Sequence, residues 1–236
     1  MLSDLLVGNV RASDRQVLIT EITRMNAGLV CVAGIDLQSG RMVRPLQPDG
    51  SNWEEAKWVR NDSIHVGSIV AVRPAVAGPA HYPHATEDFR CANLVKVGAA
   101  TDRQLYRACI TTADPDIDTL FANQVIDAKY VIDGTRCRSL GCVMVDADDL
   151  RLSEYRDKVQ VSWQDPPKVW HNLSVTEVAI RTPGADVGLR LLRARLLHVT
   201  GDVALRVGLA RGWDGNDAKY NPKRCYLQLN GLIVPA

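Results

Sequence analysis

The sequence predicts a mainly β protein, a β-rich α+β chain that folds as two small β-barrels with a few short helices. Three observations lead to this prediction. Short runs of alternating or β-branched apolar residues recur along most of the chain. Helical spacing is confined to a few short stretches. The length of 236 residues suits one large domain or two small ones.

The first half contains strand-like runs that together suffice for one small barrel. Polar and apolar residues alternate over 16–22, and a β-branched run follows over 29–35. Residues 36–40 have the composition of a tight turn, so 29–35 and 41–46 form a predicted hairpin. Further strands are expected within 63–73 and 81–97, with a polar loop over 49–61.

The middle of the chain is acidic and more helical. Residues 101–111 have helical spacing, and Thr101 is a candidate N-cap. A second short helix is expected within 116–125. We therefore predict a helical connector between the two barrels.

The second β-rich half begins near Tyr130. Strands are predicted over 139–145, 158–163, 168–173, 202–210 and 224–234, and residues 187–198 have the clearest helical spacing in the chain. The predicted organisation is an N-terminal barrel over 1–99, a connector over 100–129 and a C-terminal β-rich domain over 130–236.

Composition excludes several classes of protein. Hydrophobic residues make up 46% and charged residues 23%, as in ordinary folded proteins. The start of the chain lacks the pattern of a signal peptide, and no apolar run approaches the length of a membrane span. Six scattered cysteines form no CxxC pair. We therefore expect a protein of the reducing cytoplasm with no membrane partner.

Charge is distributed unevenly, although the net charge is only +1. Residues 112–165 carry 11 acidic and 6 basic side chains, whereas 181–224 carry 9 basic and 4 acidic ones. The basic segment is the first place to look for a phosphate-facing surface. The alternative is that these two segments complement each other inside the protein. Arginine outnumbers lysine by 21 to 7, which suits phosphate recognition but also fits a coding bias.

Several motifs resemble a known family. Residues 18–25 (LITEITRM), 30–36 (VCVAGID) and 41–46 (RMVRPL) resemble the opening of bacterial proteins described as dual OB-containing domains. Shorter similar pieces occur at 86–89, 139–141, 173–176, 205–211 and 226–229. The resemblance implies two OB-like barrels and binding of nucleic acid or nucleotides. It supplies no set of catalytic residues.

Arginine and tryptophan side chains provide the candidate binding residues. Arg24, Arg44 and Arg211 lie at strand ends within the resembling motifs, where a guanidinium can reach a phosphate or instead hold a carboxylate. Trp213 lies in a loop beside Arg211, where it could stack on a base. Trp53 and Trp58 also lie in loops, and there the favoured interpretation is that they cover a barrel end. The predicted nucleic-acid-binding set is Arg24, Arg44, Arg206, Arg211, Trp213 and Arg224.

No catalytic, metal or cofactor site is predicted. His81, His84, Glu87 and Asp88 form a compact polar cluster, but its spacing does not fit a metal site, and the favoured role of Glu87 and Asp88 is to accept hydrogen bonds. Cys137 and Cys142 lie near Arg136 and Arg138 without a histidine placed beside them. Walker A, dinucleotide-binding and nucleophile-elbow motifs are absent from the sequence.

Three functions remain open from the sequence. The first is binding of single-stranded nucleic acid or a nucleotide, which requires Arg206, Arg211 and Arg224 to share a surface with Trp213. The second is an enzyme acting on nucleic acid or a modified nucleotide, with groups drawn from His81, His84, Glu87, Asp88 and Cys142. The third is a component of a larger assembly with a protein partner, which would use an uncovered helix at 187–198.

Overall fold

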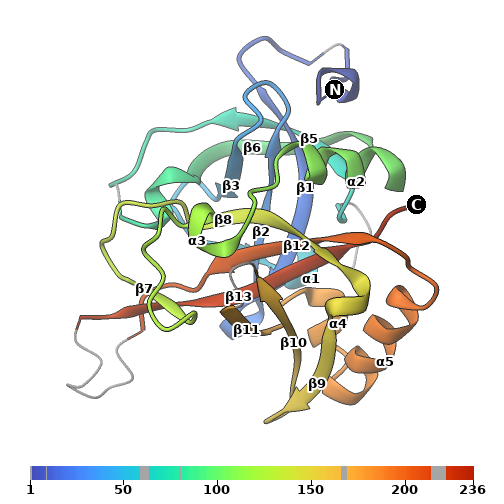
Figure 1. Ribbon diagram of the computed structural model, residues 1–236. Coiled ribbons are helices and arrows are strands. Elements are labelled where there is room, and N and C mark those ends of the chain that lie inside the picture. The colour runs from blue at the N-terminus through green and yellow to red at the C-terminus, as the bar shows by residue number, and fades with distance from the viewer. Residues whose placement is uncertain (1, 9, 59–63, 80, 166–168, 214–221) are drawn as a thin grey trace.

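The computed structural model describes every residue except 1, 9, 59–63, 80, 166–168 and 214–221. It confirms the predicted fold class. A closed five-stranded barrel and a half-barrel lie against each other, and short helices lie between and beside them (Figure 1).

The N-terminal barrel has the strand order of an OB fold. Its strands are β1 (Arg15–Arg24), β2 (Leu29–Asp36), β3 (Met42–Leu46), β5 (Ser68–Pro74) and β6 (Asp88–Ala99). They pair in the order β1-β5-β6-β3-β2, and β2 returns to β1 to close the barrel. The pairing of β3 with β6 is parallel, whereas the other pairs are antiparallel. The short strand β4 (Trp53–Glu54) pairs antiparallel with the start of β2, and helix α1 (Glu55–Trp58) follows β4.

The C-terminal half forms two sheets that face each other as a half-barrel. One contains β9 (Arg151–Tyr155), β10 (Lys158–Asp165) and β11 (Val169–Ser174), and the other contains β7 (Tyr130–Ile132), β8 (Leu140–Asp146), β12 (Asp202–Leu209) and β13 (Arg224–Ile233). A parallel bridge between Val175 and Leu229 connects the two sheets. Between the sheets lies an apolar core around the fully buried Trp163. Strand β9 was not predicted, because Leu152 is its one aliphatic residue and the sequence RLSEY does not alternate between apolar and polar residues.

The described residues form four α-helices after α1, and three of these were predicted. Helices α4 (Val178–Arg181) and α5 (Ala185–Leu196) follow β11, and α5 buries Leu192 in the core of the half-barrel. Helix α3 (Ile117–Leu120) is shorter than its predicted range. Helix α2 (Asp102–Thr111) begins after Thr101, and the predicted cap is confirmed: the Thr101 hydroxyl accepts a hydrogen bond from the Gln104 N–H in a capping box. Within the described residues, none of the helices combines the length and apolarity required to span a bilayer.

The two halves share part of their core. Helix α2 buries Leu105 in an apolar cluster that also contains Leu18 and Ile69 of the first barrel and Leu140 and Ala204 of the second half. Both faces of β1 are therefore buried along most of its length, one inside its barrel and the other against the second half. The division of the chain at 99/100 and 129/130 stays a prediction.

A charged pair is sealed into the contact between the two halves. Arg206 of β12 is 0% exposed, and its Nε donates to Oε2 of Glu21 on β1 at 3.2 Å. Asn230 of β13 donates to the other oxygen of Glu21, also at 3.2 Å. We call Glu21, Arg206 and Asn230 the seam. The hydrogen bonds compensate part of the cost of removing both charges from water.

Candidate functional site

A cleft of about 750 Å³ lies between the two halves. The first barrel contributes the end of β1, the turn that follows it, and residues of β2 and β3. The second half contributes residues of β10 and β11, the end of β12 and part of β13. In OB folds the face of the second and third strands, with the adjoining loops, binds ligands. That face of the first barrel borders this cleft.

The cleft is strongly basic. Among the described residues that line it there is no carboxylate. Lys129, Lys158 and Arg181 form no ion pair with any residue that the structure describes. The cationic side chains of the lining are Arg24, Arg44, Lys129, Lys158, Arg181 and Arg211. Such a concentration of one sign of charge in a concave surface attracts an anionic ligand.

Aromatic and amide groups complete the wall. Trp213 is 51% exposed, and its ring contacts the edge of Tyr226 with a centroid separation of 6.1 Å. The amide side chains of the lining are Asn26, Asn52, Asn172, Gln228 and Asn230. The cleft thus offers cations, hydrogen-bonding amides and a partly open indole face.

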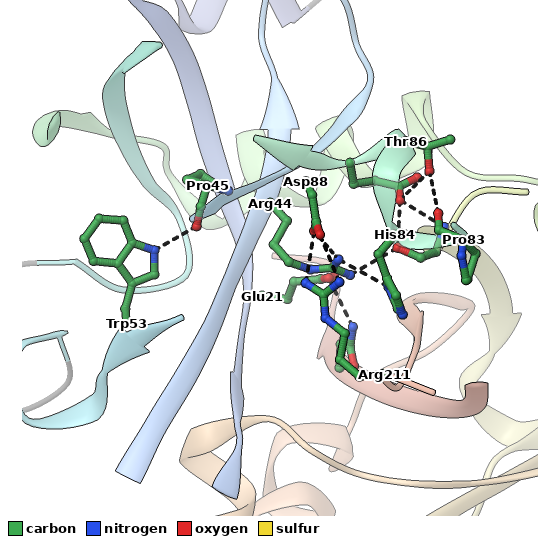
Figure 2. A network of polar contacts seen from close by, with 12 residues as sticks. Glu21, Arg44, Pro45, Trp53, Pro83, His84, Thr86, Asp88 and Arg211 are labelled. Carbon is green, nitrogen blue, oxygen red and sulfur yellow. Dashed lines mark hydrogen bonds and ion pairs between the residues drawn. The ribbon is translucent and has the colours of Figure 1, made fainter. Parts of the chain in front are cut away.

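At the rim of the cleft, two arginines share one carboxylate (Figure 2). Nη1 of Arg44 lies 2.7 Å from Oδ1 of Asp88, and Arg211 contacts both Asp88 oxygens at 2.9 and 3.2 Å. Arg44 is 4% exposed, whereas Arg211 is 38% exposed. We call Arg44, Asp88 and Arg211 the rim cluster. With two cations and one anion, the rim cluster has a net positive charge.

The rim cluster is supported by contacts between the two halves. Nη2 of Arg44 donates to Oγ of Ser139 at 3.1 Å. The backbone N–H and hydroxyl of Ser139 both donate to Glu87, at 3.0 and 2.7 Å, and burial raises the pKa of Glu87. Ser139 begins the stretch that leads into β8, so these bonds hold the second half against the loop before β6.

His84 lies beside Arg44 and is almost fully buried. Its Nδ1 lies 3.4 Å from Nη1 of Arg44. Burial, and then the nearby cations of Arg44 and Arg211, lower the pKa of His84 to about 2. The imidazole is therefore neutral at physiological pH and can accept from Arg44.

The structure brings together four of the six residues of the predicted binding set. Arg24, Arg44, Arg211 and Trp213 all line the cleft. Arg224 is joined to Trp213 by two backbone hydrogen bonds of 3.0 Å, but its guanidinium lies over the ring of Tyr130 at 4.5 Å.

The prediction for Arg206 is corrected. This side chain is fully buried in the seam and cannot share a surface with Arg211 and Trp213. Strand β12 lies between β8 and β13, so its alternate side chains face the two interiors rather than solvent. The basic segment does not pair with the acidic middle segment through Arg206 or Arg211. Those two arginines hold Glu21 and Asp88 of the first half instead.

Trp53 and Trp58 were the two loop tryptophans expected to pack on a barrel rather than to bind a ligand. Nε1 of Trp53 donates to the carbonyl of Pro45 at 2.7 Å, and the ring packs against the core of the first barrel (Figure 2). The side chain of Trp58 lies outside the described part of the chain.

The candidate enzyme groups do not converge on one cavity. His81 lies 3.3 Å from Asp133, while Glu87 and Asp88 accept the hydrogen bonds predicted for them. Cys142 lies elsewhere, buried on β8, where the neighbouring Cys109 thiol and then the Arg206 cation lower its pKa. Cys137 is also buried, and burial raises its pKa to about 11. Within the described residues, no group of three or more histidine, cysteine or acidic side chains is placed to hold a metal ion.

The helix suspected of binding a partner is mostly covered. Leu192 is fully buried, and Leu189 and Leu196 pack against the core, while Leu191 and Leu197 are 46% and 65% exposed.

Three cations of the cleft were missed from the sequence. Lys129 lies at the end of the predicted connector and Lys158 begins a strand, and no motif connects them. Arg181 is the first residue of the basic segment, so charge patterning contained a signal for it.

Comparisons with known proteins identify the family. A search of curated proteins found no match. Among solved structures, a murine DNA-binding protein bound to double-stranded DNA matches with 10% identity and a TM-score of 0.32, over 94% of this chain and 99% of that chain. The two backbones superpose only loosely. The family model of the dual OB-containing domain matches residues 15–232, and the chain therefore belongs to this family.

Proposed function

We propose that the protein binds single-stranded nucleic acid in the cleft between its two halves. The observation that carries the proposal is the cleft lining, which has six cationic side chains and no carboxylate among its described residues. Three of those cations, Lys129, Lys158 and Arg181, have no ion-pair partner in the described part of the chain. Cations of this kind neutralise phosphates.

The remaining lining favours a single strand over a duplex. Trp213 offers a ring on which an unpaired base can stack, and stacking of this kind is tolerant of sequence. Amides such as Asn172 and Gln228 can bond to base edges or sugars. In a duplex the ring faces are stacked and the Watson–Crick edges are paired, so a duplex offers no unpaired base to stack on Trp213.

A nucleotide is the second candidate ligand. The volume of about 750 Å³ falls in the range of pockets that enclose small molecules. A nucleotide would use the same cations and the same indole.

A binding titration tests the proposal. Labelled oligothymidylate, oligouridylate, a duplex and a mononucleotide are titrated at two salt concentrations, with fluorescence anisotropy as the readout. We expect the single strands to bind most tightly, with an affinity that falls steeply as salt rises. Absence of binding to all four ligands at low salt would remove the proposal.

A pair of matched double variants locates the site. Lys158→Gln with Arg181→Gln removes two cleft cations and should lower the salt slope by about 1.4, at about 0.7 for each phosphate contact. Arg103→Gln with Arg107→Gln removes two exposed cations of α2, which line none of the described cavities, and should leave the slope unchanged. Equal losses in both variants would indicate nonspecific attraction rather than this cleft.

A further inference from the structure

A second cavity of about 570 Å³ adjoins the cleft. It is formed by the end of β3, the loop after it, and the loop between β5 and β6. Asn52 and Arg211 line both cavities, so the two meet at the rim cluster. The other ionisable residues that line it are Arg15, His81, Asp88 and Arg90.

Arg90 is the distinctive residue of this cavity. Its guanidinium lies between two glycines. A Cβ atom at Gly78 would overlap the guanidinium, and one at Gly50 would come within 2.9 Å of Nη2. Because these glycines have no side chain, the backbones of the two loops approach the guanidinium closely and restrict its position. An arginine that is already restricted loses less conformational entropy when it binds a ligand.

The guanidinium of Arg90 has no acceptor among the residues that the structure describes. Asp88, the one described carboxylate in the lining, already accepts from Arg44 and Arg211. Asp49 is exposed nearby, and its pKa is lowered mainly by hydrogen bonds from Ser51 and only to a small extent by Arg90. A positioned arginine without an acceptor is the arrangement that recognises phosphate.

The other two arginines of the cavity already contact other residues of the protein. Arg15 lies over the ring of Phe89 at 4.5 Å and 3.8 Å from Asp36. Arg211 contacts Asp88. An incoming phosphate would therefore meet Arg90, which has no acceptor among the described residues, with Arg15 and Arg211 close by.

We infer that this cavity is a phosphate subsite built around Arg90, and that one nucleic-acid strand runs from the cleft past Arg211 and Asn52 into it. The inference rests on the proposed function of the cleft and extends it. The ligand is then an oligonucleotide with several phosphates rather than a mononucleotide, because only a longer strand occupies both cavities at once.

The test compares ligand lengths. Binding of a thymidine dinucleotide and of an oligothymidylate of about 12 nucleotides, a typical site size for OB folds, is measured for the full chain and for Arg90→Gln. We expect Arg90→Gln to weaken binding of the longer strand about tenfold, as the loss of a charged hydrogen bond does, and to leave the dinucleotide unaffected. The salt slope for the longer strand should fall by about 0.7.

Two further variants make the test specific. Arg90→Lys keeps the charge and should restore the salt slope without restoring the full affinity, because a lysine lacks the planar fork. Arg107→Gln removes an equivalent charge from α2 and should change neither quantity. Thermal melting of each variant confirms that the fold is retained.

The outcomes separate this inference from the proposed function. If the wild type binds the longer strand and Arg90→Gln binds it equally well, the inference of a phosphate subsite is wrong. The same holds if Arg90→Gln loses affinity equally for both lengths. In either case the proposed binding of nucleic acid in the cleft is retained. If the wild type binds neither ligand, the proposed function and the subsite both fall.

Discussion

The seam and the rim cluster join the same two halves, yet they treat charge in opposite ways. In the seam, Arg206 and Glu21 are 0% and 1% exposed and form one balanced pair. In the rim cluster, Arg44 and Arg211 share Asp88, and Arg211 is partly open to solvent. Arg206 and Arg211 lie only a few residues apart on one segment of the chain.

The difference between the two clusters is one of stoichiometry and access to water. Removing one member of a buried ion pair leaves the other charge uncompensated in a medium of low polarity. A pair of this kind therefore stabilises the structure. A cluster with excess cations beside a cleft retains attraction for an outside anion, so it can serve binding. Charge stoichiometry and access to water, rather than residue type, separate the role of Arg211 from that of Arg206.

The largest expected effect comes from breaking the seam. Arg206→Gln should lower the free energy of unfolding by about 3–5 kcal/mol, because Glu21 is then buried without its cation. Urea denaturation measures this loss. Replacing both partners, Arg206→Met with Glu21→Leu, should recover most of it. If the double variant is as unstable as the single one, packing at this position matters more than charge pairing.

The pH dependence of stability tests the desolvation of the rim. The pKa of His84 is lowered from 6.5 to about 2, so the unfolded chain takes up a proton below pH 6.5 while the folded protein does not. Stability contributed by the neutral imidazole is therefore lost as pH falls. We expect His84→Asn to remove a slope of about 1.4 kcal/mol per pH unit between about pH 6 and pH 4.

The control for the His84 experiment is His198, an exposed histidine. Denaturation curves over the same pH range should have the same slope for His198→Asn as for the wild type. An unchanged slope in His84→Asn would mean that water reaches the imidazole and that the rim is less desolvated than its burial indicates.

A smaller effect on stability distinguishes Arg211 from Arg206. Arg211→Gln removes a partly exposed contact with Asp88, so the free energy of unfolding should fall by about 1 kcal/mol or less. Its affinity for oligothymidylate should fall about tenfold. Urea denaturation and anisotropy on the same preparation measure both quantities. A loss of stability similar to that of Arg206→Gln would remove the distinction between rim and seam.

Local patterns predicted much of the fold. Alternation predicted β1, β12 and β13, the turn after residue 36 predicted the hairpin of β2 and β3, and Thr101 predicted the start of α2. Strand β9 was missed because its apolar residues do not alternate with polar ones, and Lys129 and Lys158 were missed because nothing in the sequence connects them. Strand ends within the resembling motifs selected Arg24, Arg44 and Arg211 as candidates, and the tertiary structure brings these three residues to one cleft.

The sequence by itself determined the mainly β fold class, its family resemblance and the presence of a basic C-terminal segment, because periodicity and composition are local properties. Only the tertiary structure decided which of the basic residues face water. Burial depends on strands that are distant in sequence: β1 covers Arg206, while Asp88 and Ser139 position the rim beside the cleft. A side chain's charge is local, but its solvation is set by the packing of the whole chain.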